Sequence, residues 1–475
     1  MEPTPRDAAS HRLILALLTT AGISLAVMQT MVIPALPFFQ REFETSASWV
    51  TWLVTGFLLS SSILTPILGK LADAHGKKRL LVISLGIFGV ASLGAACAWS
   101  IGSLVAFRAL QGFGAAVFPL SFGIIRDEFP PEKVGVAIGT VSSVFGVGGG
   151  VGLVASGLIV EHLSWHWLFV AGAVPILASA ILIARYVPES PVRTPARPDY
   201  AGAAALSAGF AAVLVALSEG APWGWTSPGV LALGGGGAIV LALWAAFERR
   251  VAEPLVDVGA LLRPGMAGTN AVTVLVGFSI TGFFVLVPGF VQAPPDVAGY
   301  GFGASVAESG AILLPFSLAM ILAGPAGGAL GTRHGRVVPL RIGLALGAAA
   351  LALLACLHGE AWMLAAWLPL MGCGMAFCLA AIGALVIDHS RPEETGVNSG
   401  MNSIMRTAGA ACGAQIAAAI VSAHAGPGGL PAESGFALAF AMASVALVAA
   451  LVPTLLIGGR GRRTRTVAPQ AAPAG

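Results

Sequence analysis

The sequence predicts an all-α integral membrane protein, and three observations support that fold class. Hydrophobic residues make up 56% of the 475 residues and charged residues only 10%, whereas soluble domains carry roughly 25% charge. Apolar runs long enough to cross a bilayer recur along the whole chain, and basic residues collect in every second loop between them. Because lipid offers the backbone no hydrogen-bond partners, these runs are expected to be helices.

Fourteen membrane spans are expected along the chain. A transmembrane helix keeps roughly 20 apolar residues in the hydrocarbon, and each candidate meets that length to within a few residues. The expected spans lie near residues 13–36, 47–68, 80–98, 101–124, 134–160, 166–185, 199–218, 228–247, 267–292, 306–328, 338–357, 361–386, 401–423 and 434–458.

The placement of lysine and arginine tests this count independently. If the N-terminus is cytoplasmic, every second loop should be basic, and that assignment puts 22 of the 25 basic residues on the cytoplasmic side. Only Arg41 falls outside, while Arg108 and Arg406 lie within spans. A missed or invented helix would invert the pattern downstream of the error. The expected topology is therefore a multi-pass protein of the cell membrane with both termini cytoplasmic.

A repeated loop motif divides the spans into two halves. The frame Gly-x-Leu-x-x-x-His-Gly-basic occurs at 69–77 and again at 328–336, each time on the cytoplasmic side. Two halves related by an axis along the membrane normal would place equivalent loops there. The expected organisation is a cytoplasmic N-terminus (1–12), a six-helix half (13–185), a linker with two additional spans (186–266), a second six-helix half (267–458) and a basic cytoplasmic tail (459–475).

Four motifs resemble those of a known family. Residues 69–78 are similar to the loop motif Gly-x-Leu-Ala-Asp-Arg-x-Gly-Arg-Lys, and residues 104–114 to the fourth-span motif Leu-x-x-x-Arg-x-x-Gln-Gly-x-Gly. Residues 52–57 and 165–169 resemble motifs of spans two and six. Over nearly its whole length the chain thus resembles the major facilitator superfamily, and within it the fourteen-span drug:proton antiporters. The resemblance implies the major facilitator fold and the export of drug-like compounds by proton antiport with alternating access.

Three positions depart from the family's motifs. Met28 stands where the first-span motif has an aspartate, and Leu153 follows Gly152 where the fifth-span antiport motif has a proline. Ala74 replaces the arginine that follows the loop aspartate. With a methionine at position 28, we expect the proton site to be displaced from this position or absent.

Two arginines are expected inside the hydrocarbon zone. A charge there costs about 2.5–3.5 kcal/mol at the centre of a span, so Arg108 should face a water-filled cavity or an acid, unless it snorkels to the outer interface. The resemblance implies a role in proton coupling for Arg108, together with Gln111 of the same motif. Arg406, early in span thirteen, either snorkels to the cytoplasm or lines an inner cavity, and it is the third residue expected to take part in proton coupling or translocation.

The first loop motif is expected to form a gate at the cytoplasmic end of span two. A carboxylate at the position of Asp73 is stabilised by the N-terminus of a neighbouring helix. The two lysines that follow can pair with Asp127 or Glu128 and so hold the inner side shut, or they can serve topology alone. The expected gating residues are Gly69, Asp73, Gly76, Lys77, Lys78 and Asp127.

Glycines leave span five nearly bare of side chains, as at Gly148, Gly152 and Gly157. No Gly-Lys-Ser/Thr follows the run, which excludes a phosphate-binding loop. Small residues let membrane helices approach closely, so we expect helix packing that slides during transport.

The substrate cavity is expected between the halves at mid-membrane. Amides are favoured as lining residues because lipid offers them no hydrogen-bond partner. A cavity with amides, aromatic rings and few acids suits a large amphipathic compound that is neutral or weakly anionic better than a dication. The candidate lining residues are Gln29, Thr30, Asn270, Phe283, Phe284 and Gln292.

Little in the sequence points to an enzyme. The eight histidines are scattered on both sides, and the five cysteines lie in apolar runs without metal-ligand spacing. No ring of charges indicates a channel. The expected partners are a small-molecule substrate, protons and the bilayer, in a monomer without cofactor, metal or nucleic acid. The main rival is the export or import of a specific metabolite on the same fold, without proton coupling.

Overall fold

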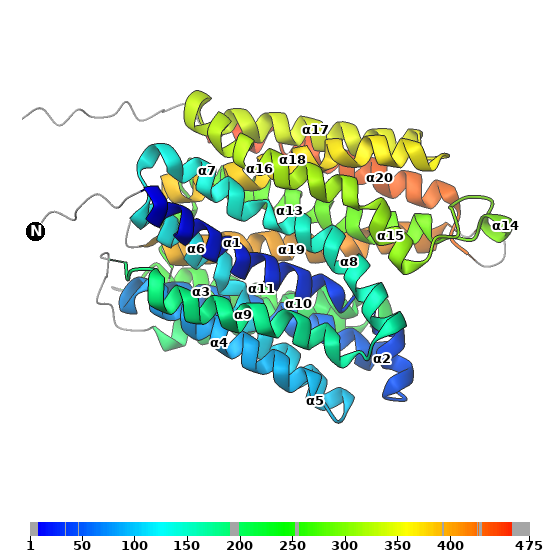
Figure 1. The fold of residues 1–475 in the computed structure, drawn as a ribbon, viewed down its shortest axis with the longest axis horizontal. Coiled ribbons are helices and arrows are strands. Elements are labelled where there is room, and N and C mark those ends of the chain that lie inside the picture. Colours follow the sequence, from blue (N-terminus) through cyan, green and yellow to red (C-terminus); the bar gives the residue numbers. More distant parts are fainter. Residues whose placement is uncertain are drawn as a thin grey trace, which may run out of the picture.

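Long helices running side by side make up the protein (Figure 1). The structure is a computed structural model, and it describes residues 8–33, 35–45, 47–190, 199–251, 256–391, 394–424, 426 and 430–457. The expected basic tail, with Arg460 to Arg465, lies outside the described residues, as do Arg6, Arg193 and Arg197.

The N-terminal half contains nine α-helices and one 3₁₀ segment within the described residues. They are α1 (Ala8–Met31), α2 (Leu36–Glu42), α3 (Ala47–His75), α4 (Lys77–Ala96), α5 (Ile101–Leu110), η1 (Gln111–Ala116), α6 (Val117–Glu128), α7 (Pro131–Ser142), α8 (Val144–His162) and α9 (His166–Tyr186).

A helical hairpin and a second half follow. The hairpin is α10 (Tyr200–Trp223) and α11 (Pro228–Glu248). The second half contains α12 (Val258–Leu261), α13 (Pro264–Val291), α14 (Pro295–Ala298), α15 (Val306–Ile312), α16 (Leu314–His334), α17 (Val337–Cys356), α18 (Ala361–His389), α19 (Thr395–Ala423), α20 (Glu433–Ala449) and the 3₁₀ turn η4 (Pro453–Leu455).

Twelve helical segments among the described residues are long and apolar enough to cross a membrane. Two shorter apolar stretches, Gly150–Val160 in α8 and Ala201–Leu217 in α10, fall where spans five and seven were expected. The all-α membrane fold is therefore confirmed, while the count of fourteen stays a prediction.

Two expected spans are interrupted rather than continuous. The fourth is α5, η1 and α6 in succession, and the fifth is α7 and α8 with a break at Ser143. Close packing accompanies the 3₁₀ turn, because a Cβ on Gly112 would lie 2.6 Å from the Cβ of Ser60, and one on Gly114 would lie 2.7 Å from Leu25 Cδ1. The sequence pattern of a single span does not reveal such close packing against other helices.

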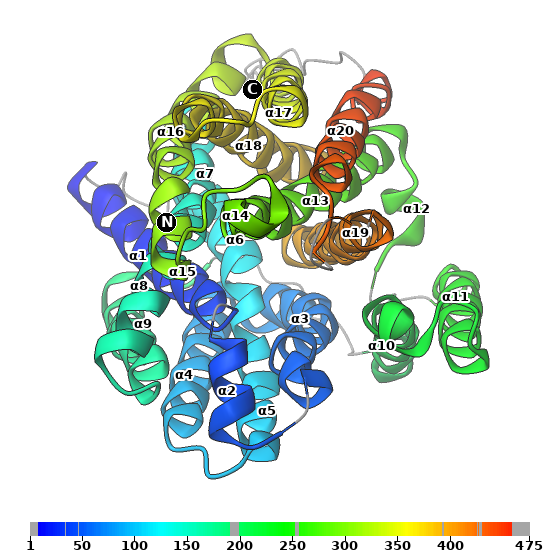
Figure 2. The same ribbon diagram turned by 90° about the vertical axis from the view of Figure 1, so that its right-hand side faces the viewer.

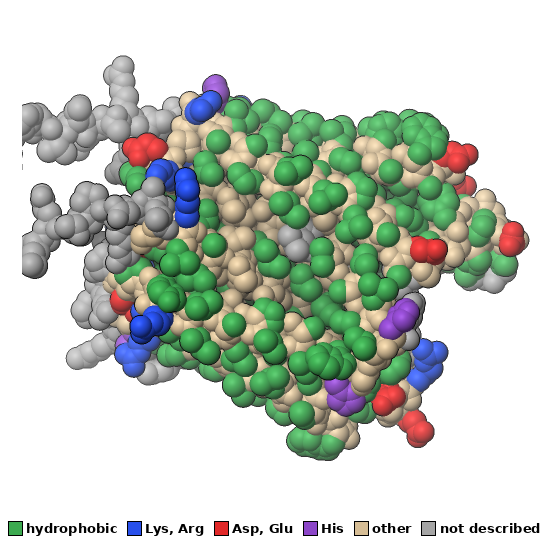
Figure 3. Space-filling view, in the orientation of Figure 1, with side chains coloured by type: hydrophobic (Ala, Val, Ile, Leu, Met, Phe, Trp, Pro, Cys, Tyr) green, Lys and Arg blue, Asp and Glu red, His purple; other side chains and the backbone are tan. Residues whose placement is uncertain are grey.

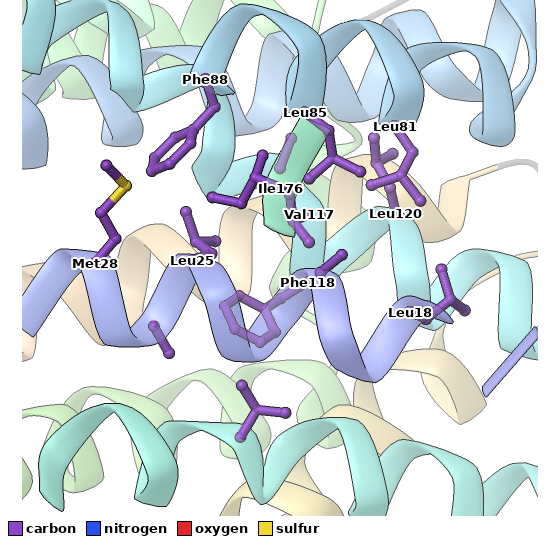
Figure 4. Packing of buried hydrophobic residues seen from close by; sticks show 14 of the residues in the cluster. Leu18, Leu25, Met28, Leu81, Leu85, Phe88, Val117, Phe118, Leu120 and Ile176 are labelled. Carbon is purple, nitrogen blue, oxygen red and sulfur yellow. The ribbon is translucent and has the colours of Figure 1, made fainter. Parts of the chain in front are cut away.

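Each half has its own apolar core. One cluster is built almost entirely from residues between Ile14 and Val187, and the other lies between Met266 and Ile457. Figure 4 shows part of the first, where Leu25 and Met28 on α1 face Leu85 and Phe88 on α4. Viewed along the helices, the halves stand beside each other, and α10 and α11 form a separate pair next to α3 and α19 (Figure 2).

Lysine and arginine side chains gather mainly at one end of the molecule (Figure 3). This end, called the basic end below, carries the connections α3–α4, α6–α7, α16–α17 and α18–α19. Most of the basic residues assigned to cytoplasmic loops lie here, among them Lys77, Arg126 and Arg336.

Labelling with a membrane-impermeant maleimide tests whether the hairpin crosses the bilayer. In a variant without the native cysteines, Thr226→Cys in the exposed turn between α10 and α11 should react in intact cells. Arg250→Cys, just after α11, should react only after permeabilisation, because the basic residues there retain that side in the cytoplasm. Protection of Thr226→Cys in intact cells would contradict two additional spans with this orientation.

Candidate functional site

The two loop motifs adopt the same turn. Gly76 precedes α4 with a φ of 110°, and Gly335 ends α16 with a φ of 90°. Residues with a Cβ rarely adopt these angles, so the turn requires glycine in both copies. At Gly76 space is also limited, since a Cβ would lie 2.5 Å from Glu189 Cδ.

Pairs of glycines bring the two halves into backbone contact near the basic end. A Cβ on Gly69 of α3 would lie 2.6 Å from the carbonyl oxygen of Gly396 on α19, and a Cβ on Gly396 would lie 2.7 Å from that of Gly69. The equivalent position in the second loop motif, Gly328 of α16, meets Gly135 of α7 in the same reciprocal way. Thus α3 crosses α19 and α16 crosses α7 with their backbones in contact at these glycines.

Asp73 caps the N-terminus of α19 across this contact. Its Oδ1 and Oδ2 accept the backbone N–H groups of Gly396 and Val397, each at 3.2 Å, and the residue is only 3% exposed. Free N–H groups and the helix dipole stabilise a carboxylate at this position. In the second motif Thr332 occupies the corresponding place, and its hydroxyl donates to the Gly328 carbonyl of its own helix. The Arg336 guanidinium lies at this second crossing, where a Cβ on Gly135 would overlap it. Of the two motif positions, only Asp73 places a carboxylate on the N-terminus of the opposing helix.

Arg126, at the end of α6, adds further bonds between the halves. Its guanidinium donates to the carbonyl oxygen of Ser390 at 3.2 Å and to that of Arg391 at 3.4 Å. It also donates to the hydroxyl of Thr395, the first residue of α19. Sequence reasoning placed Arg126 only as a topology signal, since nothing near it in the chain marks its distant acceptors. In this structure the basic end is closed.

Lys77 and Asp127 form a buried ion pair, with Nζ 2.6 Å from Oδ2 and side-chain exposures of 0% and 4%. The Ser190 hydroxyl also donates to this carboxylate. Because α4 and α6 belong to the same half, the pair braces that half and does not hold the two halves together. The structure thus contains the expected pair of Lys77 with Asp127, while its expected part in keeping the inner side shut stays a prediction.

Lys78 contributes its backbone N–H to a helix cap, rather than its ammonium group to an ion pair between the halves. Its N–H and that of Arg79 donate to the two carboxylate oxygens of Glu189 at 3.0 and 3.1 Å. Glu189 thus caps α4 as Asp73 caps α19, and sequence reasoning missed it. The available signal was an acidic residue shortly after span six, on the same side of the membrane as the N-terminus of α4 with its free N–H groups.

Arg108 lies in a polar network buried among α1, α3, α4 and α5. It is 1% exposed, donates to the Leu53 carbonyl at 2.9 Å and to Gln111 Oε1 at 2.6 Å, and places its guanidinium carbon 4.8 Å from the centre of the Phe57 ring. These bonds and the cation–π contact offset part of the cost of burying the charge. The guanidinium is therefore held inside the half rather than snorkelling to the interface.

The network continues from Gln111 to Met28. The Gln111 amide donates to the Ser92 hydroxyl at 2.9 Å, and that hydroxyl lies 2.7 Å from the Phe88 carbonyl and 3.4 Å from the Met28 sulfur. A thioether is a weak acceptor and carries no proton. Among the described residues no carboxylate forms an ion pair with Arg108. The position that departs from the family's motif therefore terminates this network.

Several expected cavity residues pack elsewhere. The Thr30 hydroxyl bonds the Gly148 carbonyl where α1 meets α8, and Phe283 and Phe284 form an aromatic cluster with Phe316. Gln292 is exposed at the end of α13. Each was placed by residue type alone, and residue type does not determine which helix face points inward.

Other expected residues contribute to helix packing or to a polar cluster. A Cβ on Gly148 would lie 2.8 Å from the Ala26 carbonyl oxygen, and one on Gly157 would lie 3.2 Å from Ala307 Cβ; a Cβ on Gly152 would overlap Thr30. Gln29 is half-buried on α1. Asn270 accepts from Asn402 Nδ2 at 2.9 Å, and the same amide donates to the Thr273 hydroxyl at 2.8 Å.

A cavity lies between the halves, further into the membrane than the Asp73 and Arg126 contacts. Its volume is about 50 Å³, far below the 300–1,000 Å³ of pockets that hold drug-sized ligands, so it is nearly closed in this conformation. The lining residues are Phe118, Pro119, Phe122, Ser142, Leu379, Ile382, Gly383, Val386, Ser399, Asn402, Ser403 and Arg406. Arg406 thus lines an inner cavity, one of its two expected placements.

The polar groups of this cavity come mainly from α19. Arg406 Nη2 donates to Ser403 Oγ at 3.4 Å. The hydroxyls of Ser142 and Ser399 are buried without a hydrogen-bond partner among the described residues, a situation that costs about 1–3 kcal/mol per group. Sequence reasoning missed both serines, because single serines in apolar spans are common.

The fold and these contacts define a helical membrane protein of two repeated halves that meet at a closed end. The sequence profile of the Major Facilitator Superfamily matches residues 18–292 and 269–474. The chain belongs to this superfamily. Among solved structures, the human organic anion transporter MFSD10 (TETRAN) has the same fold, with a TM-score of 0.67 at 15% identity, over 94% of this chain and 99% of that one.

Curated relatives include several named for drug resistance. The chain is 28% identical to the tetracenomycin C resistance and export protein of Streptomyces glaucescens, over 78% of this chain and 69% of that protein. It is 29% identical to multidrug resistance protein 3 of Bacillus subtilis, over 70% and 63%. It is 32% identical to the puromycin resistance protein pur8 of Streptomyces alboniger, over 67% of each. The chain thus spans about two thirds of the length of each of these relatives, from 63% to 69%.

The buried ion pair yields a stability prediction. Asp127→Asn leaves the Lys77 ammonium buried without its carboxylate, and removing one partner of such a pair costs about 3–5 kcal/mol. We expect the apparent melting temperature of the purified protein to fall by several degrees, and Lys77→Met/Asp127→Leu to recover much of the loss.

The more exposed pair between Arg336 and Asp388, at 3.4 Å, supplies the control. Asp388→Asn should cost no more than about 1 kcal/mol, because solvent screens the pair. Equal small effects of Asp127→Asn and Asp388→Asn would show that the Lys77 pair does not brace the half.

Proposed function

We propose that this chain is a secondary active transporter that exports drug-like, amphipathic compounds across the cell membrane by alternating access. The observation that carries the proposal is the closed end, where breakable polar bonds join two otherwise separate cores next to a nearly closed cavity. Relatives named for resistance to tetracenomycin C, puromycin and multiple drugs support export rather than catalysis.

The proposal includes the expected topology. The basic end faces the cytoplasm, both termini lie on that side, and the chain crosses the membrane fourteen times as a monomer. Helices α8 and α10 supply the two spans beyond the twelve found by length and apolarity. The chain then belongs with the fourteen-span drug:proton antiporters that its motifs resemble.

The gate consists of the contacts that cross between the halves. Opening towards the cytoplasm requires Asp73 to leave the N-terminus of α19 and Arg126 to leave the α18–α19 connection. Water can solvate each of these groups once they separate, so the bonds are exchanged rather than lost. Gly69 and Gly396 have no interlocking side chains, which lets the helices part and return to the same contact.

Proton coupling, as proposed here, involves the buried arginines rather than position 28. Arg108 and Gln111 link α3, α4 and α5 through hydrogen bonds that a change of protonation nearby would alter. Met28 cannot bind a proton at neutral pH. The proton is therefore carried by an acid nearer the membrane surface, or a charge on the substrate takes the place of the proton. In the second case Arg406 is the buried arginine that lines the cavity.

Expression in an efflux-deficient host tests export directly. Cells that produce the protein should tolerate higher concentrations of several antibiotics and dyes, puromycin among them, and should accumulate less of each. Gly69→Val is the matched inactive variant, since its side chain would occupy the space of the Gly396 backbone. Unchanged sensitivity across the panel, or greater accumulation of one compound, would contradict export and favour uptake of a specific metabolite.

Inverted vesicles separate export from its energy source. With an imposed pH gradient, acid inside, uptake of an exported dye should rise, and collapse of the gradient should abolish the rise. Transport that ignores the gradient would contradict proton antiport while leaving export intact.

A further inference from the structure

We infer that the cavity at Arg406 binds an acidic group, so that the preferred ligands are organic anions with an aromatic body. The inference rests on the proposed function, since it names the substrate class of the same site. Its basis is the set of side chains that line the cavity between α6, α7, α18 and α19.

The charge of the lining is positive. Arg406 is its basic member, and the described residues of the lining include no aspartate or glutamate. Arg406 lies eleven residues after Thr395, the first residue of α19, which is about 16 Å along the helix from the contacts at the basic end. A guanidinium at this depth favours an anion over a cation in the adjoining space, where water screens little of its charge.

Hydrogen-bond donors face the same space. The hydroxyls of Ser142 and Ser399 are 1% and 7% exposed respectively, and neither has a hydrogen-bond partner among the described residues. They come from opposite halves, Ser142 from the end of α7 and Ser399 from the first turns of α19. A carboxylate between them can accept from both, and so satisfy two buried donors while it pairs with the guanidinium.

Neighbouring groups hold the guanidinium and the helix in place. Arg406 bonds Ser403 one turn earlier, and both amide hydrogens of Asn402 are used on Asn270 and Thr273 of α13. Asn402 therefore fixes α19 against α13 and leaves anion recognition to the arginine and the serines. Phe118 and Phe122 of α6 offer apolar faces to the rest of a ligand.

The small volume of the cavity defines when this recognition occurs. At about 50 Å³ it accommodates no drug-sized ligand, so the ligand enters only after the basic end opens. Because Ser142 and Arg406 belong to different halves, an acidic group bound to both favours the conformation in which the halves close around it. The anion thus contributes to closure as well as to selectivity.

Matched ligand pairs test the inference on the purified full-length protein. Naphthalene- and anthracene-carboxylic acids are compared with their primary amides, which have the same shape and no charge. We expect the acids to bind about tenfold more tightly than the amides, because hydrogen bonds to charged groups are stronger. Arg406→Gln should remove this preference, and Arg406→Lys should retain most of it.

Further variants keep the test decisive if Arg406→Gln does not fold. Ser142→Ala/Ser399→Ala should lower the acid-to-amide affinity ratio several-fold, while Arg249→Gln, on the exposed end of α11, should leave it unchanged. Equal binding of acids and amides, tighter binding of the cation ethidium, or no binding of any acid would overturn the inference.

The outcomes also separate this inference from export itself. Resistance to neutral or cationic drugs that survives in Arg406→Gln cells, together with equal binding of acids and amides, would leave export standing and remove the anion site. Acid-selective binding in a protein that confers no resistance and moves no dye would leave the anion site standing and contradict export.

Discussion

The closed arrangement of this protein depends on one contact, the Asp73 carboxylate at the N-terminus of α19. It forms only because Gly69 and Gly396 allow the backbones of α3 and α19 to touch, which brings the carboxylate within reach of two free N–H groups. Glycine alone would give a close crossing without a preferred position. The carboxylate alone, on a wider crossing, would find water instead. Together they give a contact that is specific in position and can still be exchanged for solvent.

The two repeats differ in a way that suits alternating access. Both loop motifs make the same glycine turn and the same glycine crossing, but Thr332 replaces the carboxylate in the second copy. The crossing of α16 with α7 thus has the Arg336 guanidinium beside it and no carboxylate from its motif on the opposing helix, whereas Asp73 supplies such a cap where α3 crosses α19. Arg126 strengthens the same charged side through its bonds to the α18–α19 connection. We interpret the capped crossing of α3 with α19 as the one that parts and the crossing of α16 with α7 as the pivot.

Much of the fold could be predicted from local sequence, and the site only in part. Span length and basic loops are properties of contiguous residues, so the helices and the capping role of Asp73 could be inferred. The position of Phe283 or Thr30 depends instead on which helix face turns inward, and that is decided by packing between distant segments. Ser142 and Ser399 are ordinary serines until the fold places both in the lining of one cavity. The Lys77 pair had the right partner in Asp127, but the fold places both in one half.

The distance between the halves at the basic end reports directly whether the Asp73 contact holds this end closed. Spin labels at His75→Cys on α3 and Arg391→Cys before α19, both exposed positions, report it by pulsed electron paramagnetic resonance. We expect a short and a long distance in equilibrium. Asp73→Ala should shift the population towards the long one, since loss of a helix cap costs about 0.5–2 kcal/mol, with Asp73→Asn in between. A single short distance that neither substitution changes would contradict the role of Asp73 in holding this end closed.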